Sequence, residues 1–200
     1  MRVFLAGATG VVGVRLVPLL SEAGHIVAGL TRTPAKAELL EILGAEPVVG
    51  DVFDRKLFVG RMTAFGPDVV IQQLTDLPDD VTRIAESADA NNRIRREGTS
   101  NLLDAAHQSG ARRFLAQSVA WTLPGDAGRA VEEMETRVLD FGGTVLRYGQ
   151  FYGEGTYHPS EPPAPPRIHI DEAALRTLHS VEAGPGIVEL VEDVLTEGPR

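Results

Sequence analysis

A glycine-rich turn near the start of the chain constrains its fold more than any other feature. The apolar run at residues 3–6 leads into three glycines spaced three apart, and a helical pattern follows from about residue 11 to residue 23. A strand, such a turn and a helix form a dinucleotide-binding signature, although a glycine-rich turn without a ligand can have the same letters. The turn consists of Gly7, Ala8, Thr9, Gly10, Val11, Val12 and Gly13.

Each glycine has a physical role in that signature. Gly7 permits a tight turn, Gly10 lets a pyrophosphate approach the backbone, and Gly13 lets the helix pack closely. The amino terminus of the helix offers N–H groups and a partial positive charge to the phosphates. Because a strand and a helix flank the turn, we expect it to be a cofactor cradle.

The rest of the chain repeats the alternation of apolar runs and amphipathic segments, which predicts an α/β fold of the Rossmann type with a doubly wound parallel sheet. Strands are expected at residues 2–6, 25–30, 46–49, 68–73, 113–117 and from 143 onward, with helices at 11–23, 34–43, 54–63, 82–109 and 128–140. We expect residues 1–155 to form the nucleotide-binding domain. Residues 156–200 should complete the same domain as a rudimentary cap, with a proline-rich loop, a helix at 171–183 and a strand at 187–190.

Composition excludes several classes of function. The formal net charge of −9 argues against binding to a nucleic-acid backbone. The chain has no cysteine, which excludes disulfides, thiolate metal sites and cysteine nucleophiles. Its histidines and carboxylates show no spacing typical of metal ligands. No apolar stretch approaches the roughly 20 residues that span a bilayer. We therefore expect a cytoplasmic protein with a small-molecule partner and no nucleic-acid or membrane partner.

The residues after the second predicted strand bear on which dinucleotide binds. An NAD site carries an acidic residue there for the ribose 2′-hydroxyl, whereas this chain has Thr31, Arg32 and Lys36 in the sequence TRTPAK. An arginine pairs with a 2′-phosphate, and a carboxylate would repel it. Arg32 therefore favours NADP(H) over NAD(H), with a solvated surface arginine as the alternative.

These motifs, taken in order, resemble those of the extended or atypical short-chain dehydrogenases/reductases, the NAD-dependent epimerase/dehydratase family. The resemblance rests on the segments GATGVVG, GD at residues 50–51, DVVIQQLT, EGTSNLLDAA, RFLAQSVA and TVLRYGQFYGEGT. It implies that Asp51 and Val52 contact the adenine, that residues from the fourth strand follow the cofactor ribose, and that Arg147 lies near the nicotinamide. The ribose residues are Gln73, Leu74 and Thr75.

The chain departs from this family in its proton-transfer residues. The resemblance implies a Tyr-x-x-x-Lys pair near residues 127 and 131, counted back from Glu135, but those positions are Ala127 and Val131. The only lysines of the chain are Lys36 and Lys56, both in its first third. The usual tyrosine–lysine mechanism is therefore absent, and the C-terminal substrate region is much shorter than in the family.

Two residues remain as candidates for chemistry. Ser118 falls at the end of the fifth predicted strand, where the resemblance implies a catalytic serine, and it could instead satisfy the strand end. Tyr152 flanks the turn that the resemblance implies beside the nicotinamide, although packing is the more common role for a tyrosine without a cationic neighbour.

Two functions are consistent with this pattern. One is an atypical oxidoreductase, epimerase or isomerase that acts on a small carbonyl- or sugar-like metabolite. The other is a catalytically degenerate protein that senses NADP(H). The family often pairs through the helices predicted at 82–109 and 128–140, so a homodimer is also expected.

Overall fold

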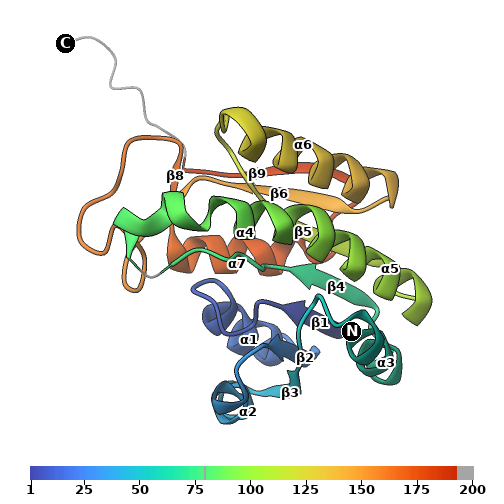
Figure 1. Cartoon of the computed structure of the whole chain (residues 1–200). Coiled ribbons are helices and arrows are strands. Elements are labelled where there is room, and N and C mark those ends of the chain that lie inside the picture. Colours follow the sequence, from blue (N-terminus) through green and yellow to red (C-terminus); the bar gives the residue numbers. More distant parts are fainter. Residues whose placement is uncertain (79, 193–200) are drawn as a thin grey trace, which may run out of the picture.

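The central feature of the computed structural model, which describes residues 1–78 and 80–192, is a seven-stranded parallel sheet (Figure 1). The strand order is β3-β2-β1-β4-β5-β6-β9, and every neighbouring pair is parallel. This doubly wound order confirms the fold class predicted from the alternating pattern. The strands are β1 (Arg2–Ala6), β2 (Ile26–Thr31), β3 (Ala45–Val49), β4 (Val69–Gln72), β5 (Arg113–Val119), β6 (Thr144–Tyr148) and β9 (Gly186–Leu190).

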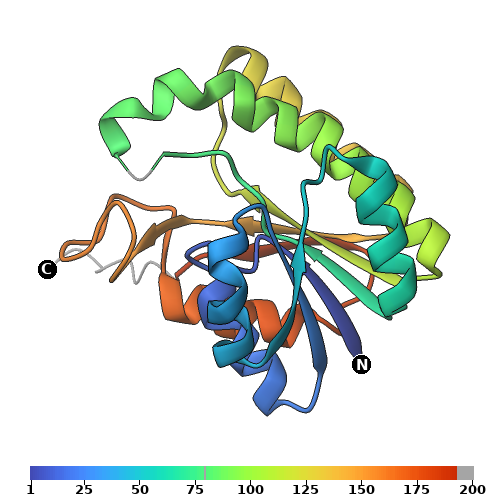
Figure 2. The ribbon, with the colours of Figure 1, turned by 60° about the horizontal axis from the view of Figure 1, so that its bottom comes forward.

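Helices cover both faces of the sheet, as Figure 2 shows. On one face lie α1 (Gly13–Glu22), α2 (Ala37–Leu43) and α7 (Ile170–Ser180), whose apolar side chains pack in one core cluster. On the other lie α3 (Arg55–Phe65), α4 (Ala88–Arg93), α5 (Thr99–Ser109) and α6 (Gly125–Asp140). Burial on both faces explains why the strands read as nearly continuous apolar runs.

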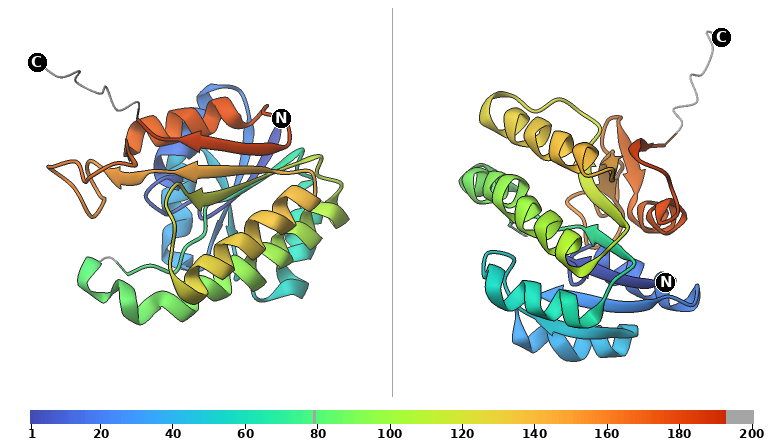
Figure 3. Two further views of the ribbon diagram at one scale, coloured as in Figure 1. Left: turned by 90° about the horizontal axis from the view of Figure 1, so that it is seen from above. Right: turned by 90° about the vertical axis from the view of Figure 1, so that its right-hand side faces the viewer.

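The segment predicted as one helix at residues 82–109 has four parts. A 3-10 turn at Val81–Ser87 leads into α4, a π-helical turn at Ile94–Gly98 follows, and α5 completes the segment. Single π-helical turns occur mostly within longer helices and often near functional sites. Figure 3 shows this segment beside α6 along one side of the molecule.

The carboxyl ends of the strands, where ligands bind in doubly wound sheets, carry the longer connections. One of them contains an unpredicted two-stranded parallel sheet of β7 (Gln150–Tyr152) and β8 (Arg167–His169). The proline-rich loop joins these two strands, and β9 then returns to the edge of the main sheet beside β6. Residues 193–200, the end of the predicted C-terminal segment, lie outside the described residues.

Candidate functional site

The glycine turn connects β1 to α1 in a conformation that side chains would obstruct. Gly7 has a φ of +90°, and a Cβ on it would lie 2.6 Å from the carbonyl oxygen of Gln73. A Cβ on Gly13 would lie 2.3 Å from the carbonyl oxygen of Gly7, so this glycine permits close packing of the turn on itself. Gly10 is exposed between them. The turn therefore presents bare backbone at the carboxyl edge of the sheet.

The amino terminus of α1 is free of groups that would compete with a phosphate. Val12 caps the helix without a side-chain hydrogen bond, and the first turn contains no acidic residue. The N–H groups and the helix dipole there favour an anion. Together with the bare backbone of Gly10, these features fit the pyrophosphate of a dinucleotide.

The predicted 2′-phosphate residue, Arg32, lies directly after β2 and is paired with a carboxylate that the sequence pattern did not reveal. Its Nη2 atom lies 2.9 Å from Oδ1 of Asp76, in the connection after β4. The neighbouring Thr31 is buried, and its hydroxyl oxygen accepts the N–H of Thr33 and lies 3.4 Å from that of Thr9. Lys36 is exposed at the end of a 3-10 turn.

The residues expected near the adenine lie after β3. Asp51 is partly exposed, and its Oδ1 accepts the N–H of Phe53 at 2.9 Å. Val52 is buried among the apolar side chains of the α3–α5 face, and its carbonyl accepts a hydrogen bond from Asn101. The carboxylate of Asp51 is thus the more accessible group of the two.

The three residues that follow β4 point in different directions. The Gln73 side chain is buried toward α7, where its Nε2 donates to the hydroxyl of Tyr148 at 2.9 Å. That hydroxyl lies 2.6 Å from Thr177, and burial raises the pKa of Tyr148 to about 12. Leu74 packs on the α3–α5 face, and Thr75 is exposed.

Buried Ser118 and Glu135 form a compact cluster with the partly exposed Arg147 between β5, α6 and β6. The Ser118 hydroxyl donates to Oε1 of Glu135 at 2.5 Å, and the two side chains belong to residues that are 4% and 6% exposed. The Arg147 guanidinium donates to both oxygens of the same carboxylate, at 3.0 and 2.5 Å. These hydrogen bonds with Glu135 raise the pKa of Arg147. The proton of Ser118 is therefore engaged within the protein.

The hydroxyl groups of all three tyrosines also donate to protein acceptors. Tyr152 donates to the carboxylate of Glu192, a hydrogen bond that raises the pKa of the tyrosine. Tyr157 donates to the carbonyl of Pro78, which joins the proline-rich loop to the connection after β4. Tyr148 donates to Thr177, because the Thr177 hydroxyl proton bonds to the carbonyl of Ala173. No tyrosine has a hydroxyl proton free of protein contacts.

The helix α6 carries Ala127 and Val131, the two positions at which the family resemblance implies a tyrosine and a lysine. Ala127 and Val131 are half-buried one turn apart, and Glu135 follows after a further turn. No group of three or more histidine, cysteine or acidic side chains suited to a metal occurs in the described part of the chain. No helix among residues 1–78 and 80–192 has the length and apolar character needed to cross a membrane.

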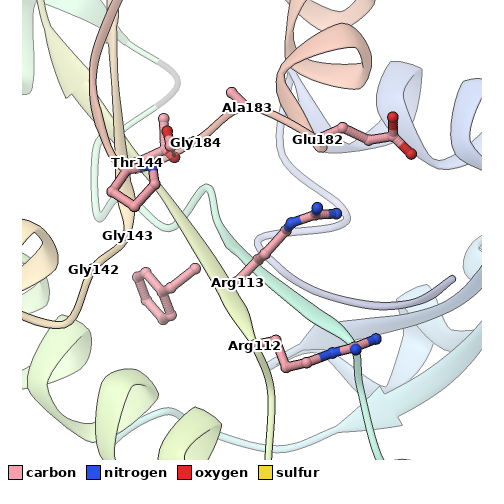
Figure 4. A pocket seen from close by; sticks show the side chains of 10 residues that line it. Arg112, Arg113, Gly142, Gly143, Thr144, Glu182, Ala183 and Gly184 are labelled. Carbon is pink, nitrogen blue, oxygen red and sulfur yellow. Dashed lines mark hydrogen bonds between the residues drawn. The ribbon is translucent and has the colours of Figure 1, made fainter.

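The cavity drawn in Figure 4 lies at the amino ends of β5, β6 and β9, whereas the glycine turn lies at the carboxyl ends of the strands. It has a volume of about 220 Å³ and includes Arg112, Arg113, Thr144 and Glu182 in its lining. Because ligands of doubly wound sheets bind at the carboxyl ends, this cavity is separate from the glycine turn.

Comparison with known proteins agrees with the geometry of the turn. The NAD(P)H-binding family matches residues 7–141. A Streptomyces protein named 3-diazoavenalumate denitrifying reductase is 39% identical over 184 aligned residues, which cover 78% of this chain and 58% of that protein. A 3-beta-hydroxysteroid dehydrogenase from Mycolicibacterium neoaurum is 30% identical over 118 residues, which cover 57% of this chain and 31% of the other. The chain thus spans less than two thirds of these relatives.

Solved structures show the same fold at lower identity. A Thermus thermophilus UDP-glucose 4-epimerase, in complex with NAD, has a TM-score of 0.78 at 16% identity; the match covers 96% of this chain and 78% of that one. A Bacillus halodurans protein assigned to the NAD-dependent epimerases/dehydratases has a TM-score of 0.76 at 21% identity, with 96% and 95% coverage.

Proposed function

The chain belongs to the NAD(P)H-binding family, and on that premise we propose that it is a reductase whose hydride acceptor needs no proton from the protein. The observation that carries this proposal is the engagement of every expected proton donor. Ser118 donates to Glu135, and the tyrosine hydroxyls donate to Thr177, Glu192 and Pro78. A carbonyl acceptor acquires negative charge on oxygen as it is reduced and benefits from a general acid. A cationic or strongly electron-poor acceptor can take up the hydride without a general acid.

A diazonium group is such an acceptor, and the Streptomyces relative is named as a reductase of a diazo compound. We propose an aryl diazonium or similarly electron-poor aromatic substrate for this chain. Hydride addition forms an N–H bond at the terminal nitrogen and gives a neutral aryl diazene. The N–H and aryl C–N bonds of the diazene then break, dinitrogen leaves, and the hydrogen from nitrogen forms a C–H bond on the ring, so that atoms and charge balance without an added acid.

The protein residues would hold the cofactor and shape the site. Gly7, Gly10 and Gly13 would accommodate the pyrophosphate, with Thr9 and Arg32 toward the adenosine end. When bound, the dihydronicotinamide would supply a hydride, which carries the two electrons and the hydrogen that this reduction requires. We propose that Ser118 and Arg147 orient the substrate rather than transfer a proton, because Glu135 holds both side chains at the carboxyl ends of β5 and β6. Because its proton is donated to Glu135, the Ser118 hydroxyl can only accept a hydrogen bond from a substrate.

Arg32 supports a preference for NADP(H) over NAD(H), since a guanidinium pairs with a 2′-phosphate. We also propose a homodimer through α5 and α6, which lie side by side on one face of the sheet (Figure 3). A shallow groove of about 410 Å³ runs over α6 at Arg129, Glu132, Glu133, Thr136 and Arg137. Light scattering after gel filtration would give the mass in solution, and a monomer at micromolar concentration would contradict this pairing.

The reaction is tested by anaerobic oxidation of NADPH or NADH with a benzenediazonium salt, a matched benzaldehyde and no acceptor. We expect cofactor oxidation and dinitrogen release with the diazonium salt above the rate without protein. A Gly10→Glu variant is the control for reduction of the diazonium salt by free cofactor. Its carboxylate, at an exposed position of the turn, would repel the pyrophosphate and prevent the protein from binding the cofactor. Reduction of the aldehyde alone would refute the proposed acceptor class. Cofactor binding without oxidation by either acceptor would favour a sensing function.

A further inference from the structure

The ion pair between Arg32 and Asp76 lies beside the glycine turn, at the carboxyl end of the sheet. Arg32 follows β2, Asp76 follows β4, and β1 lies between these two strands in the sheet. Its partners therefore approach each other over the carboxyl end of β1, from which the glycine turn departs. An adenosine bound at this edge would lie beside both charges.

Both residues of the pair are anchored by hydrogen bonds close to their own backbones. The N–H of Thr33 donates to the buried Thr31, which flanks Arg32. The N–H of Asp76 donates to Oδ1 of Asn91 on α4 at 3.1 Å. The side chains themselves remain accessible, with exposed fractions of 49% for Arg32 and 34% for Asp76. A ligand can thus reach the pair without disturbing the backbone that carries it.

The two charges act on a 2′-phosphate in opposite directions. The Arg32 guanidinium attracts the phosphate, whereas the Asp76 carboxylate occupies one of the guanidinium donors and offsets its charge. A ribose with a free 2′-hydroxyl carries no charge there, so the ion pair can remain intact. The carboxylate paired with Arg32 comes from the connection after β4.

We propose that Asp76 is a specificity-determining residue that competes with the 2′-phosphate for Arg32 and so limits the preference for NADP(H). This inference rests on the proposed nucleotide-binding function. Asp76 acts through Arg32 and is therefore a positioning residue. Its removal should raise affinity for the 2′-phosphorylated nucleotide and leave affinity for the unphosphorylated nucleotide almost unchanged.

The test uses 2′,5′-ADP and 5′-AMP, which differ only in the 2′-phosphate, titrated by calorimetry into the full chain. Their affinity ratio cancels any general effect of a substitution on folding. We expect Asp76→Asn to raise the ratio in favour of 2′,5′-ADP by about three- to tenfold, the size expected when one charged donor of a solvated guanidinium becomes available to the phosphate. The matched control is Asp104→Asn, because Asp104 pairs with Arg55 at 2.8 Å with similar exposure but lies on α5.

A double-mutant cycle distinguishes action through Arg32 from a direct effect of the lost charge. Arg32→Ala should bring the ratio close to one, and Asp76→Asn added to it should change the ratio by less than about twofold. An unchanged ratio in Asp76→Asn, or an equal rise in the Arg32→Ala background, would overturn the inference while the proposed function stands. No binding of NADP(H), NAD(H) or either probe by the unmodified chain would instead refute the proposed function, and this inference with it.

Discussion

Replacing Glu135 with glutamine should destabilise the protein strongly, although the two side chains have nearly the same shape. The Glu135 carboxylate accepts three hydrogen bonds, one from Ser118 and two from Arg147. The glutamine amide keeps one acceptor oxygen and places its NH₂ group opposite the Nη2 donor, now 2.5 Å from the carboxylate. The substitution therefore leaves the guanidinium without the carboxylate to which it is hydrogen-bonded.

The magnitude follows from the exposure of the two partners. Removing one member of a fully buried ion pair costs about 3–5 kcal/mol. The Arg147 side chain is 34% exposed and recovers part of its hydration, so we expect a loss of about 2–4 kcal/mol in the free energy of unfolding. For a domain of this size, that corresponds to a fall of about 5–15 °C in melting temperature.

Urea denaturation monitored by circular dichroism measures this loss. Glu97→Gln is the matched control, because Glu97 pairs with Arg93 four residues away on an exposed helical surface and should cost less than about 0.5 kcal/mol. The paired substitution Glu135→Leu with Arg147→Met should recover much of the stability, since it leaves no buried charge. A Glu135→Gln variant within 0.5 kcal/mol of the unmodified protein would refute this account of the cluster.

Three further changes test other parts of the structure. Gly13→Ala should abolish nucleotide binding measured by calorimetry, because its Cβ would lie 2.3 Å from a backbone oxygen; Gly60→Ala, which has open space around it in α3, should keep binding. Burial raises the pKa of Tyr148 to about 12, so this residue stabilises the fold below its ordinary pKa, and that contribution is lost as pH rises from 10 to 12. The stability difference between the unmodified protein and Tyr148→Phe should thus shrink by about 1 kcal/mol between pH 9 and pH 11 in urea titrations. Hydrogen bonds from Arg96 lower the pKa of Asp126, so the stabilising effect of Arg96 is present above about pH 4 and falls in more acidic solution. Urea titrations of Arg96→Gln and the unmodified protein measure this effect, and a difference in the free energy of unfolding that does not change with pH would contradict it.

The fold was predictable because its determinants are local and repeated. Burial on both faces makes each central strand apolar, and the intervening helices show one apolar face each, so the alternation is visible in the letters. The boundaries of α6 and of the segment before α5 were less predictable. Gly125 begins α6 three residues before the predicted start, and a π-helical turn interrupts a pattern that looks continuous.

The pairing of β7 with β8 was not visible in the sequence. Each strand has only three residues, and the proline-rich loop separates them along the chain. Short strands of this kind are stabilised by their neighbours rather than by propensity. The sheet brings Tyr152 close to Glu192, a partner forty residues away, and so changes what its hydroxyl can do.

The amino-acid sequence by itself determined the doubly wound fold, the glycine turn and the absence of a tyrosine–lysine pair, because each depends on residue type and spacing along the chain. Tertiary structure alone decided which charges meet. It brought Asp76 to Arg32 across β1, and it placed Glu135 between Ser118 and Arg147. These contacts depend on the order of strands in the sheet, because that order brings together residues that are far apart in the sequence. The glycines indicate the type of ligand, whereas only the tertiary structure shows that the Ser118 and Tyr152 hydroxyls donate to Glu135 and Glu192.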